Sequence, residues 1–272
     1  MNNPVTDINM PELLEDVIKI AIEASKEILV VYETEFNVDN KEDRSPLTAA
    51  DMASHKLICR KLTELTPVIP ILSEESSAIP YATRKTWQRY WLVDPLDGTR
   101  EFIKRNGEFT VNIALIEQHK PILGVVQVPV KNLCYFAATG LGAFRREASQ
   151  TITLHVRQTD PAQFTVAGSR SHGSEKQAAF IELLGKNAEL IAIGSSLKFC
   201  LVAEGLVDIY PRFGPTSEWD TAAAQCIVEQ AGGMVTDTTF KPLRYNTKES
   251  LLNPEFLVIA DRNFNWQPFL PH

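Results

Sequence analysis

The chain has 272 residues and a formal net charge of −7, with 27 Lys and Arg residues against 34 Asp and Glu residues. Hydrophobic residues make up 44% and charged residues 22%, which is usual for a globular chain and excludes a disordered or fibrous protein. The acid excess argues against a broad nucleic-acid-binding surface, because phosphate backbones need clustered Lys and Arg. A small anionic ligand remains compatible with this acid excess, since a bound divalent cation reverses the charge of a site locally.

The four cysteines lie far apart and form no Cys-x-x-Cys pair, which predicts free thiols in a reducing compartment. The sequence shows no signal-peptide pattern and no apolar stretch long enough to cross a bilayer. We therefore expect a cytoplasmic protein. A peripheral position on the inner face of the cell membrane stays open, although no basic amphipathic helix supports it.

Helical periodicity predicts an amphipathic helix over 11–32 and a second helix from about Thr48 to Pro67. A charged loop is expected between them at 37–44. Short β-like segments follow, and turn residues between several of them favour antiparallel pairing. These segments cover 68–72, 90–93, 109–116, 122–128 and 133–137.

After about residue 150 the pattern changes to alternating strands and helices, which indicates an α/β half after an α+β half. We therefore expect two tightly packed domains, 1–150 and 151–272, with a ligand cleft between them. The predicted strands cover 164–167, 190–193, 207–210, 234–236 and 256–260. The predicted helices cover 174–184, 198–204 and 219–231.

The segment Trp-Leu-Val-Asp-Pro-Leu-Asp-Gly-Thr is the most informative part of the sequence. Three apolar residues lead to Asp94, where Pro95 is expected to end the strand, and Asp97 follows after a turn. Two carboxylates this close persist only with a cation between them, and oxygen ligands suit magnesium. Gly98 and Thr99 would open a helical turn, capped by Thr99, whose N–H groups can hold an oxyanion. Taken alone, the same residues also fit an ordinary turn and cap.

Three further acids occupy positions of the same kind. Glu74 follows a short apolar strand, Asp220 opens an alanine-rich helix, and Asp51 is expected in the first turn of the helix near Thr48. Each of them alone also fits a solvated strand end or a residue that complements a helix dipole. The alanines after Asp220 would let their helix approach another element closely.

The four motifs together have a recognisable order along most of the chain. A Thr-x-x-Asp helix start, a Ser-Glu-Glu strand end, the Asp-Pro-x-Asp-Gly-Thr motif and a Trp-Asp-x-Ala-Ala helix resemble the inositol monophosphatase-like superfamily of lithium-sensitive, magnesium-dependent phosphatases. The Asp-Pro-x-Asp-Gly-Thr motif is highly specific. This resemblance implies a layered α/β/α/β/α sandwich, with a metal site where the two halves meet.

The resemblance also implies roles for individual residues. Asp51 and Thr99, together with Glu74, would activate the attacking water, and the N–H groups of Gly98 and Thr99 would hold phosphoryl oxygens. Two or three Mg²⁺ ions would be bound between protein and substrate. Their ligands would be Glu74, Asp94, the backbone carbonyl of Leu96, Asp97 and Asp220.

Two C-terminal segments, 167–172 and 194–212, resemble the CysQ-type 3'(2'),5'-bisphosphate nucleotidases within this superfamily. Cationic side chains suit a phosphate that does not react, and polar groups suit the sugar and base. Taken alone, the basic residues also fit solvated surface charges, and the histidine fits an ordinary loop position. The residues that the resemblance places around the adenosine and its second phosphate are His172, Ser195, Lys198 and Arg212.

The expected function is magnesium-dependent conversion of adenosine 3',5'-bisphosphate to AMP and phosphate, in sulfur metabolism and with lithium as an inhibitor. Its sulfated precursor, 3'-phosphoadenosine 5'-phosphosulfate, would be a second substrate. Inositol monophosphatase or fructose-1,6-bisphosphatase activity is the alternative, and a metal-binding scaffold is the non-enzymatic one. The expected partner is a small nucleotide bisphosphate rather than a nucleic acid polymer, and the sequence leaves the oligomeric state open.

Overall fold

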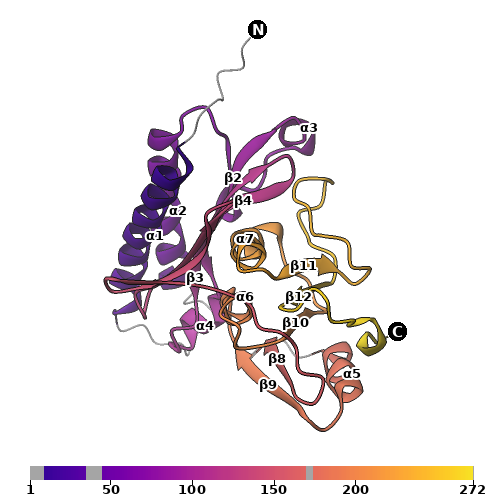
Figure 1. The fold of residues 1–272 in the computed structure, drawn as a ribbon. Coiled ribbons are helices and arrows are strands. Elements are labelled where there is room, and N and C mark those ends of the chain that lie inside the picture. The colour runs from indigo at the N-terminus through magenta and orange to yellow at the C-terminus, as the bar shows by residue number, and fades with distance from the viewer. Residues whose placement is uncertain (1–8, 35–44, 170–173, 272) are drawn as a thin grey trace.

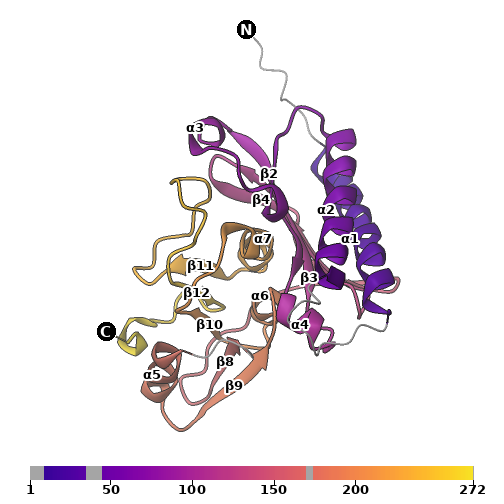
Figure 2. The same ribbon diagram turned by 180° about the vertical axis from the view of Figure 1, so that it is seen from behind.

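The computed structural model describes residues 9–34, 45–169 and 174–271. It contains two β-sheets with helices outside and between them, so that five layers follow one another as helices, sheet, helices, sheet and helix (Figure 1). The view from behind shows the same order of layers (Figure 2). The predicted loop at 37–44 lies outside the described residues.

The first layer is a pair of helices, α1 (Met10–Tyr32) and α2 (Ser45–Leu65), which pack against each other and against the first sheet. The buried face of α1 includes Val17, Ile18 and Ile28, as its helical periodicity predicts. Helix α2 begins before the predicted start at Thr48. Asp51 therefore lies in the second turn of α2, and its predicted place in a first turn is wrong.

The second layer is a seven-stranded sheet in which the strands follow one another in sequence order. All neighbouring strands are antiparallel except β1 and β2, which are parallel because a 3₁₀ turn, η1 (Glu74–Ser76), and a short helix, α3 (Tyr81–Arg84), separate them. The strands are β1 (Ile71–Ser73), β2 (Arg89–Asp97), β3 (Thr110–Glu117), β4 (Lys120–Val128), β5 (Leu133–Ala138), β6 (Gly142–Glu147) and β7 (Gln150–Thr153). The sequence did not predict β6 and β7.

Strand β2 does not end at Pro95 as predicted. Asp94 pairs with Asn112 of β3, the register then shifts, and Asp97 pairs with Thr110. A bulge of this kind tolerates proline because the residues inside it make no ladder hydrogen bonds. Because the strand continues through this bulge, Asp94 and Asp97 both lie near the C-terminal end of β2.

The fourth layer is a five-stranded sheet of order β11-β12-β10-β8-β9, in which β8, β9 and β10 are parallel and β12 is antiparallel to its neighbours. Helix α5 (Glu175–Leu184) covers its outer face through Phe180 and Leu184. The strands are β8 (Phe164–Ser169), β9 (Ala188–Ile193), β10 (Ile209–Arg212), β11 (Met234–Asp237) and β12 (Phe256–Ile259). A 3₁₀ turn, η3 (Gln267–Phe269), follows near the end of the chain.

The middle layer consists of α6 (Leu197–Ala203) and α7 (Ala222–Gln230). Helix α7 lies very close to β4: a Cβ atom on Gly124 would lie 2.1 Å from the backbone oxygen of Ala223. The predicted helix at 219–231 is divided, because a 3₁₀ turn, η2 (Glu218–Asp220), precedes α7. Asp220 thus lies in η2, and its predicted place in the first turn of the alanine-rich helix is wrong.

One buried hydrophobic cluster joins the two sheets through the middle layer. It includes Leu92 and Ala114 of the first sheet, Cys226 of α7, and Tyr210 and Val258 of the second sheet. The two halves therefore share a core, and the division into domains 1–150 and 151–272 stays a prediction.

All four cysteines are free thiols. None of the helices in the described ranges combines the length and apolar character that a membrane-spanning segment requires.

Candidate active site

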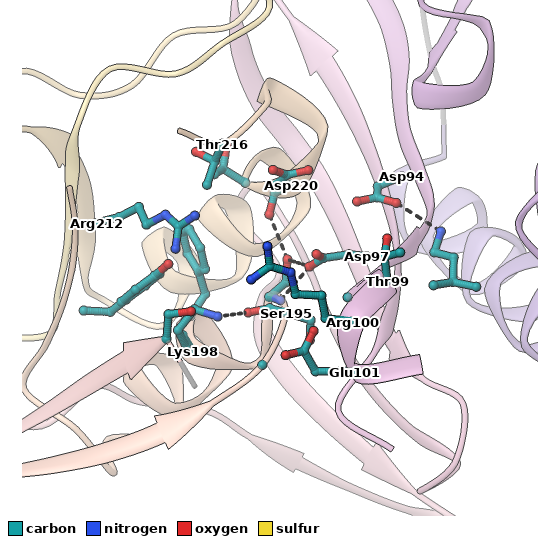
Figure 3. Close-up of a pocket in the computed structure, with 18 of the residues that line it drawn as sticks. Asp94, Asp97, Thr99, Arg100, Glu101, Ser195, Lys198, Arg212, Thr216 and Asp220 are labelled. Atoms are coloured by element: carbon teal, nitrogen blue, oxygen red, sulfur yellow. Dashed lines mark hydrogen bonds between the residues drawn. The ribbon is translucent and has the colours of Figure 1, made fainter. Parts of the chain in front are cut away.

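A pocket of about 390 Å³ opens where the end of β2 meets α6 and η2 (Figure 3). Its walls therefore come from both halves of the chain. The predicted site residues among its lining are Glu74, Asp94, Leu96, Asp97, Gly98, Thr99, Ser195, Lys198, Arg212 and Asp220. Asp51 is not among the lining residues, and His172 lies outside the described residues.

The end of β2 turns sharply into α4 (Thr99–Ile103). Asp94 is buried, and its Oδ1 atom accepts a hydrogen bond of 3.0 Å from the N–H of Leu96. Gly98 has a left-handed φ of 100°, a conformation that favours glycine. Gly98 is the N-cap residue of α4 and Thr99 is the first helical residue. The prediction that Thr99 caps this helix is therefore wrong.

Asp97 is hydrogen-bonded at one carboxylate oxygen by residues from both halves. Its Oδ2 atom accepts hydrogen bonds from the N–H and hydroxyl of Ser196, at 2.7 and 2.9 Å. The side chains of Thr110 and Asn112 donate to the same oxygen, each at 3.4 Å. Because these donors converge on Oδ2, the orientation of the carboxylate is fixed.

Asp220 is fixed by its own short turn. Its Oδ2 atom accepts from the N–H of Ser217 at 2.8 Å, which forms a capping box. The neighbouring Glu218 is buried and accepts from the N–H of Asn246 at 2.8 Å, while Arg84 donates to the Asn246 side chain at 2.5 Å. The turn that carries Asp220 is therefore attached to two distant segments of the chain.

Glu74 and Asp51 come from elements that precede β2 in the chain, the turn η1 and the helix α2. Glu74 follows β1, the parallel neighbour of β2, and its side chain is hydrogen-bonded to Asp94. Asp51 is hydrogen-bonded to Glu75 rather than to Thr99, and its buried Oδ1 atom has no partner. The structure gives no hydrogen bond between Asp51 and Thr99, and of the two only Thr99 lines the pocket.

Burial raises the pKa of all five carboxyl groups, and neighbouring acids add to the shift at Asp51, Glu74, Asp94 and Asp220. Burial is the largest cause of the pKa of about 8 for Asp51, about 7 for Glu74 and about 8 for Asp220. The pKa of Asp94 is raised well above its usual range by burial and then by the neighbouring acids, and burial also raises that of Asp97. Fully ionised, this group needs a positive counter-charge.

The donor set fits a hard divalent cation. It offers carboxylate and carbonyl oxygens. Burial, and then the neighbouring acids, raise the pKa values of Asp94 and Asp220, and a bound cation would stabilise their ionised forms. In the described part of the chain, no three Asp, Glu, His or Cys side chains are already gathered as a ready-made ligand cage. The fit therefore rests on the chemistry of the donors and on their repulsion.

The opposite end of the pocket is basic. Figure 3 shows Lys198 and Arg212 on the side away from Asp94 and Thr99. Lys198 is buried, and its Nζ atom donates to the carbonyl of Ser195 at 2.6 Å. Burial lowers the pKa of Lys198 to about 8, although the nearby Asp97 opposes this shift. The alternative that Lys198 is a solvated surface charge is therefore wrong.

Two features of this basic end concern groups that a substrate could contact. Arg212 is half-buried, and its guanidinium donates to the carbonyls of Gly214 and Pro215 at 3.2 and 3.0 Å. Ser195 has a φ of 48°, and its buried hydroxyl oxygen has no partner. A bound ligand can therefore supply the hydrogen bond that this hydroxyl lacks.

Sequence reasoning missed several residues at the pocket. Arg100 and Thr216 border the cavity in Figure 3, and Tyr210 and Phe256 add aromatic surface to it. Ser196, which hydrogen-bonds Asp97, was also missed. Its only signal was its place within the segment 194–212, because its partners are distant in sequence.

Comparison with known proteins places these features in a family. Residues 9–266 match the model of the inositol monophosphatase family. The 3'(2'),5'-bisphosphate nucleotidase CysQ of Salmonella typhimurium is 50% identical over 248 residues, which cover 90% of this chain and 99% of that protein. The CysQ protein of Aggregatibacter actinomycetemcomitans is 42% identical, with coverage of 93% and 95%.

Solved structures agree with this assignment. The crystal structure of CysQ from Bacteroides thetaiotaomicron, a bacterial member of the inositol monophosphatase family, has a TM-score of 0.85 and 42% identity, covering 94% of this chain and 100% of that one. An inositol monophosphatase from Zymomonas mobilis has a TM-score of 0.80 at 22% identity, covering 97% and 98%, and so supports the fold alone. The predicted α/β fold is confirmed, and the chain belongs to the inositol monophosphatase family.

Proposed function

We propose that this chain is a magnesium-dependent 3'(2'),5'-bisphosphate nucleotidase that converts adenosine 3',5'-bisphosphate to AMP and phosphate. The observation that carries the proposal is a pocket with two unlike ends, acidic around Asp94 and Asp97 and basic around Lys198 and Arg212. A substrate with two phosphates can place one at each end. The identity of 50% to CysQ nucleotidases supports the same substrate class.

The acidic end would bind the cation. Two or three Mg²⁺ ions suit this oxygen-rich donor set. When bound, they would supply charge stabilisation and lower the pKa of the attacking water. The proposed ligands are Glu74, Asp94, the backbone carbonyl of Leu96, Asp97 and Asp220, all of which line the pocket.

Residues at the start of α4 and in α2 would act on the reacting groups. The hydroxyl of Thr99 would orient the water. Asp51 is not among the residues that line the pocket, so its role is assigned on the family resemblance: its partnerless Oδ1 atom would accept the proton of the water. Glu74 would assist from the adjoining turn. The N–H groups of Gly98 and Thr99 would donate to the phosphoryl oxygens, which carry the charge that develops during displacement.

The basic end would bind the rest of the nucleotide. Arg212 suits the 5'-phosphate, because a guanidinium can donate two hydrogen bonds to it. Lys198 would add positive charge and maintain the position of Ser195, whose hydroxyl would contact the substrate. His172 is assigned to the nucleoside on the family resemblance.

A substrate panel tests this proposal. Phosphate release with Mg²⁺ is measured for adenosine 3',5'-bisphosphate, 3'-phosphoadenosine 5'-phosphosulfate, inositol monophosphate and fructose-1,6-bisphosphate. We expect the highest kcat/KM for a bisphosphorylated nucleotide, with adenosine 5'-monophosphate as the product of the first substrate. A clear preference for inositol monophosphate or fructose-1,6-bisphosphate would overturn the assignment and support the alternative activity.

An Asp97→Asn variant separates an enzyme from a metal-binding scaffold. We expect turnover to fall by at least about 100-fold, because even residues that only orient a metal ligand typically cost 10- to 100-fold. A folded variant with full turnover would support the scaffold.

Lithium at millimolar concentration should also inhibit the unmodified protein, in a phosphate-release assay with sodium as the control salt.

A further inference from the structure

We propose that Ser196 is a positioning residue that fixes Asp97 and Asp220 relative to each other and thereby sets the affinity of the carboxylate site for a divalent cation. The inference rests on the proposed function only in taking these two aspartates as cation ligands. It concerns a residue that does not itself contact the reacting atoms.

Ser196 immediately precedes α6 and is 2% exposed. Its N–H and its hydroxyl both donate to Asp97 Oδ2, at 2.7 and 2.9 Å. The same hydroxyl lies 2.8 Å from the backbone carbonyl oxygen of Asp220. It also accepts a hydrogen bond of 3.0 Å from the side chain of Asn112. One serine thus connects β2, β3 and η2.

The hydroxyl has a single hydrogen, so it can donate fully to only one acceptor at a time. Asn112 occupies its acceptor side, and the hydrogen is therefore directed between Asp97 and the carbonyl of Asp220. Both acceptors lie within hydrogen-bonding distance of one atom. The distance between Asp97 Oδ2 and the Asp220 carbonyl oxygen is thus limited by the Ser196 hydroxyl, although the two aspartates come from different halves of the chain.

The turn that carries Ser196 is itself anchored from both halves. The N–H of Gly194 donates to the carboxylate of Glu108 at 2.8 Å, and Lys198 donates to the carbonyl of Ser195 at 2.6 Å. A Cβ atom at Gly194 would lie 2.4 Å from the Cγ atom of Glu101, so only glycine allows this close approach. The position of Ser196 is therefore well determined.

This arrangement has a consequence for cation binding. Asp97 is held at Oδ2, so its other oxygen points in a fixed direction, and a pre-oriented ligand loses less conformational entropy when it binds an ion. Without the hydroxyl, Asp97 keeps the Ser196 N–H, but its link to η2 is lost. A serine that only stabilised the core would instead affect folding and leave cation affinity unchanged.

The test measures Mn²⁺ binding to the purified full chain by electron paramagnetic resonance, with Tm measured in parallel. For Ser196→Ala we expect the Kd for Mn²⁺ to rise by about 10- to 100-fold, the usual effect of losing a residue that orients a metal ligand. Ser196→Thr keeps the hydroxyl and should restore the Kd to within a few-fold of the unmodified protein. The conservative variant therefore separates the hydroxyl from the rest of the side chain.

Ser25→Ala is the matched control. Ser25 is a buried serine of α1, 3% exposed, whose hydroxyl donates to the carbonyl of Ala21 at 2.9 Å. Its loss removes the same chemical group far along the chain from the pocket residues. We expect a change in Tm comparable to that of Ser196→Ala, with no change in the Kd for Mn²⁺.

The inference is overturned if Ser196→Ala binds Mn²⁺ as tightly as the unmodified protein does. Should Ser196→Ala fail to fold, Ser196→Cys replaces it, since a thiol fills the space but hydrogen-bonds weakly; the same loss of affinity is expected, and an unchanged Kd overturns the inference. Failure of the proposed function would look different: the unmodified protein would bind Mn²⁺ and respond to Ser196→Ala, yet release no phosphate from the nucleotide.

Discussion

Arg212 is the residue that best distinguishes a bisphosphate nucleotidase from a phosphatase of simple monoesters. It lies at the basic end of the pocket, and its guanidinium group would contact the phosphate that does not react. We expect Arg212→Ala to raise KM for adenosine 3',5'-bisphosphate by about 10- to 100-fold, which corresponds to the ~1.5–3 kcal/mol of a hydrogen bond to a charged group. Steady-state phosphate release measures this effect.

Adenosine 3'-monophosphate is the control substrate for this variant, since it lacks the 5'-phosphate. Its kcat/KM should change little in Arg212→Ala. The guanidinium also donates to Gly214 and Pro215, so its loss can disturb the loop before η2. An equal loss with both substrates would mean that Arg212 stabilises this loop and would refute the phosphate contact.

At the residue scale, the sequence predicted four acids that line the pocket, Glu74, Asp94, Asp97 and Asp220, but not how they are held, and the fifth, Asp51, is not among the lining residues. Asp94 and Asp97 belong to a short, specific motif, so their proximity was readable from neighbouring residues. Ser196 was not readable in this way, because it is separated by about a hundred residues from Asp97 and its role exists only in the folded chain. Hydrogen bonds between distant segments leave no local pattern.

At the scale of elements, periodicity predicted the buried helices and strands better than the edge of the sheet. Strand β7 is exposed along its length, and β6 carries Arg145, Arg146 and Glu147. Polar edge strands avoid unwanted pairing, but they lack the apolar alternation by which strands are recognised. The bulge in β2 was missed for another reason, since Pro95 is a usual sign that a strand ends.

The contact between α7 and β4 gives a prediction at this scale. The alanines of α7 permit a close approach, and Gly124 completes it because a Cβ atom there would lie 2.1 Å from the Ala223 oxygen. Gly124→Ala must push the helix and the sheet apart. Overpacking of this kind costs about 1–3 kcal/mol, so we expect Tm to fall by roughly 2–10 °C.

Gly214→Ala is the control for this substitution. A Cβ atom at Gly214 would make only ordinary contacts, at 3.8 Å, with the Arg212 side chain. Differential scanning calorimetry should therefore show a Tm close to that of the unmodified protein. If Gly124→Ala melted at the same temperature as this control, the close contact between α7 and β4 would not be a determinant of stability.

At the scale of the whole molecule, the net charge of −7 at first argues against phosphate ligands. Part of that excess is concentrated in one pocket, where burial and then the nearby Asp97 raise the pKa values of Asp94 and Asp220. Bound cations would reverse the sign of this region. The acid excess over the rest of the surface still disfavours a long polyanion, which agrees with a small bisphosphate as the ligand.

The same acids predict how stability depends on pH. The folded protein binds protons more tightly than the unfolded chain does, because the pKa rises from 3.8 to about 8 for Asp51 and Asp220 and from 4.5 to about 7 for Glu74. Without divalent cations, their contribution is therefore most favourable below pH ~4 and is lost progressively as the pH rises toward ~8. Mg²⁺ should oppose this loss, since it binds the ionised form.

We therefore expect Mg²⁺ to raise Tm by more at pH ~8.5 than at pH ~5.5, where protons compete for the carboxylates. Thermal melts in a chelator and in millimolar Mg²⁺ measure this difference, with sodium chloride at equal ionic strength as the control for general screening. Ser25→Ala, which leaves the carboxylates intact, should show the same pH dependence. An Mg²⁺ effect of equal size at both pH values would contradict the assignment of these acids to a cation site, because binding would then not compete with their protonation.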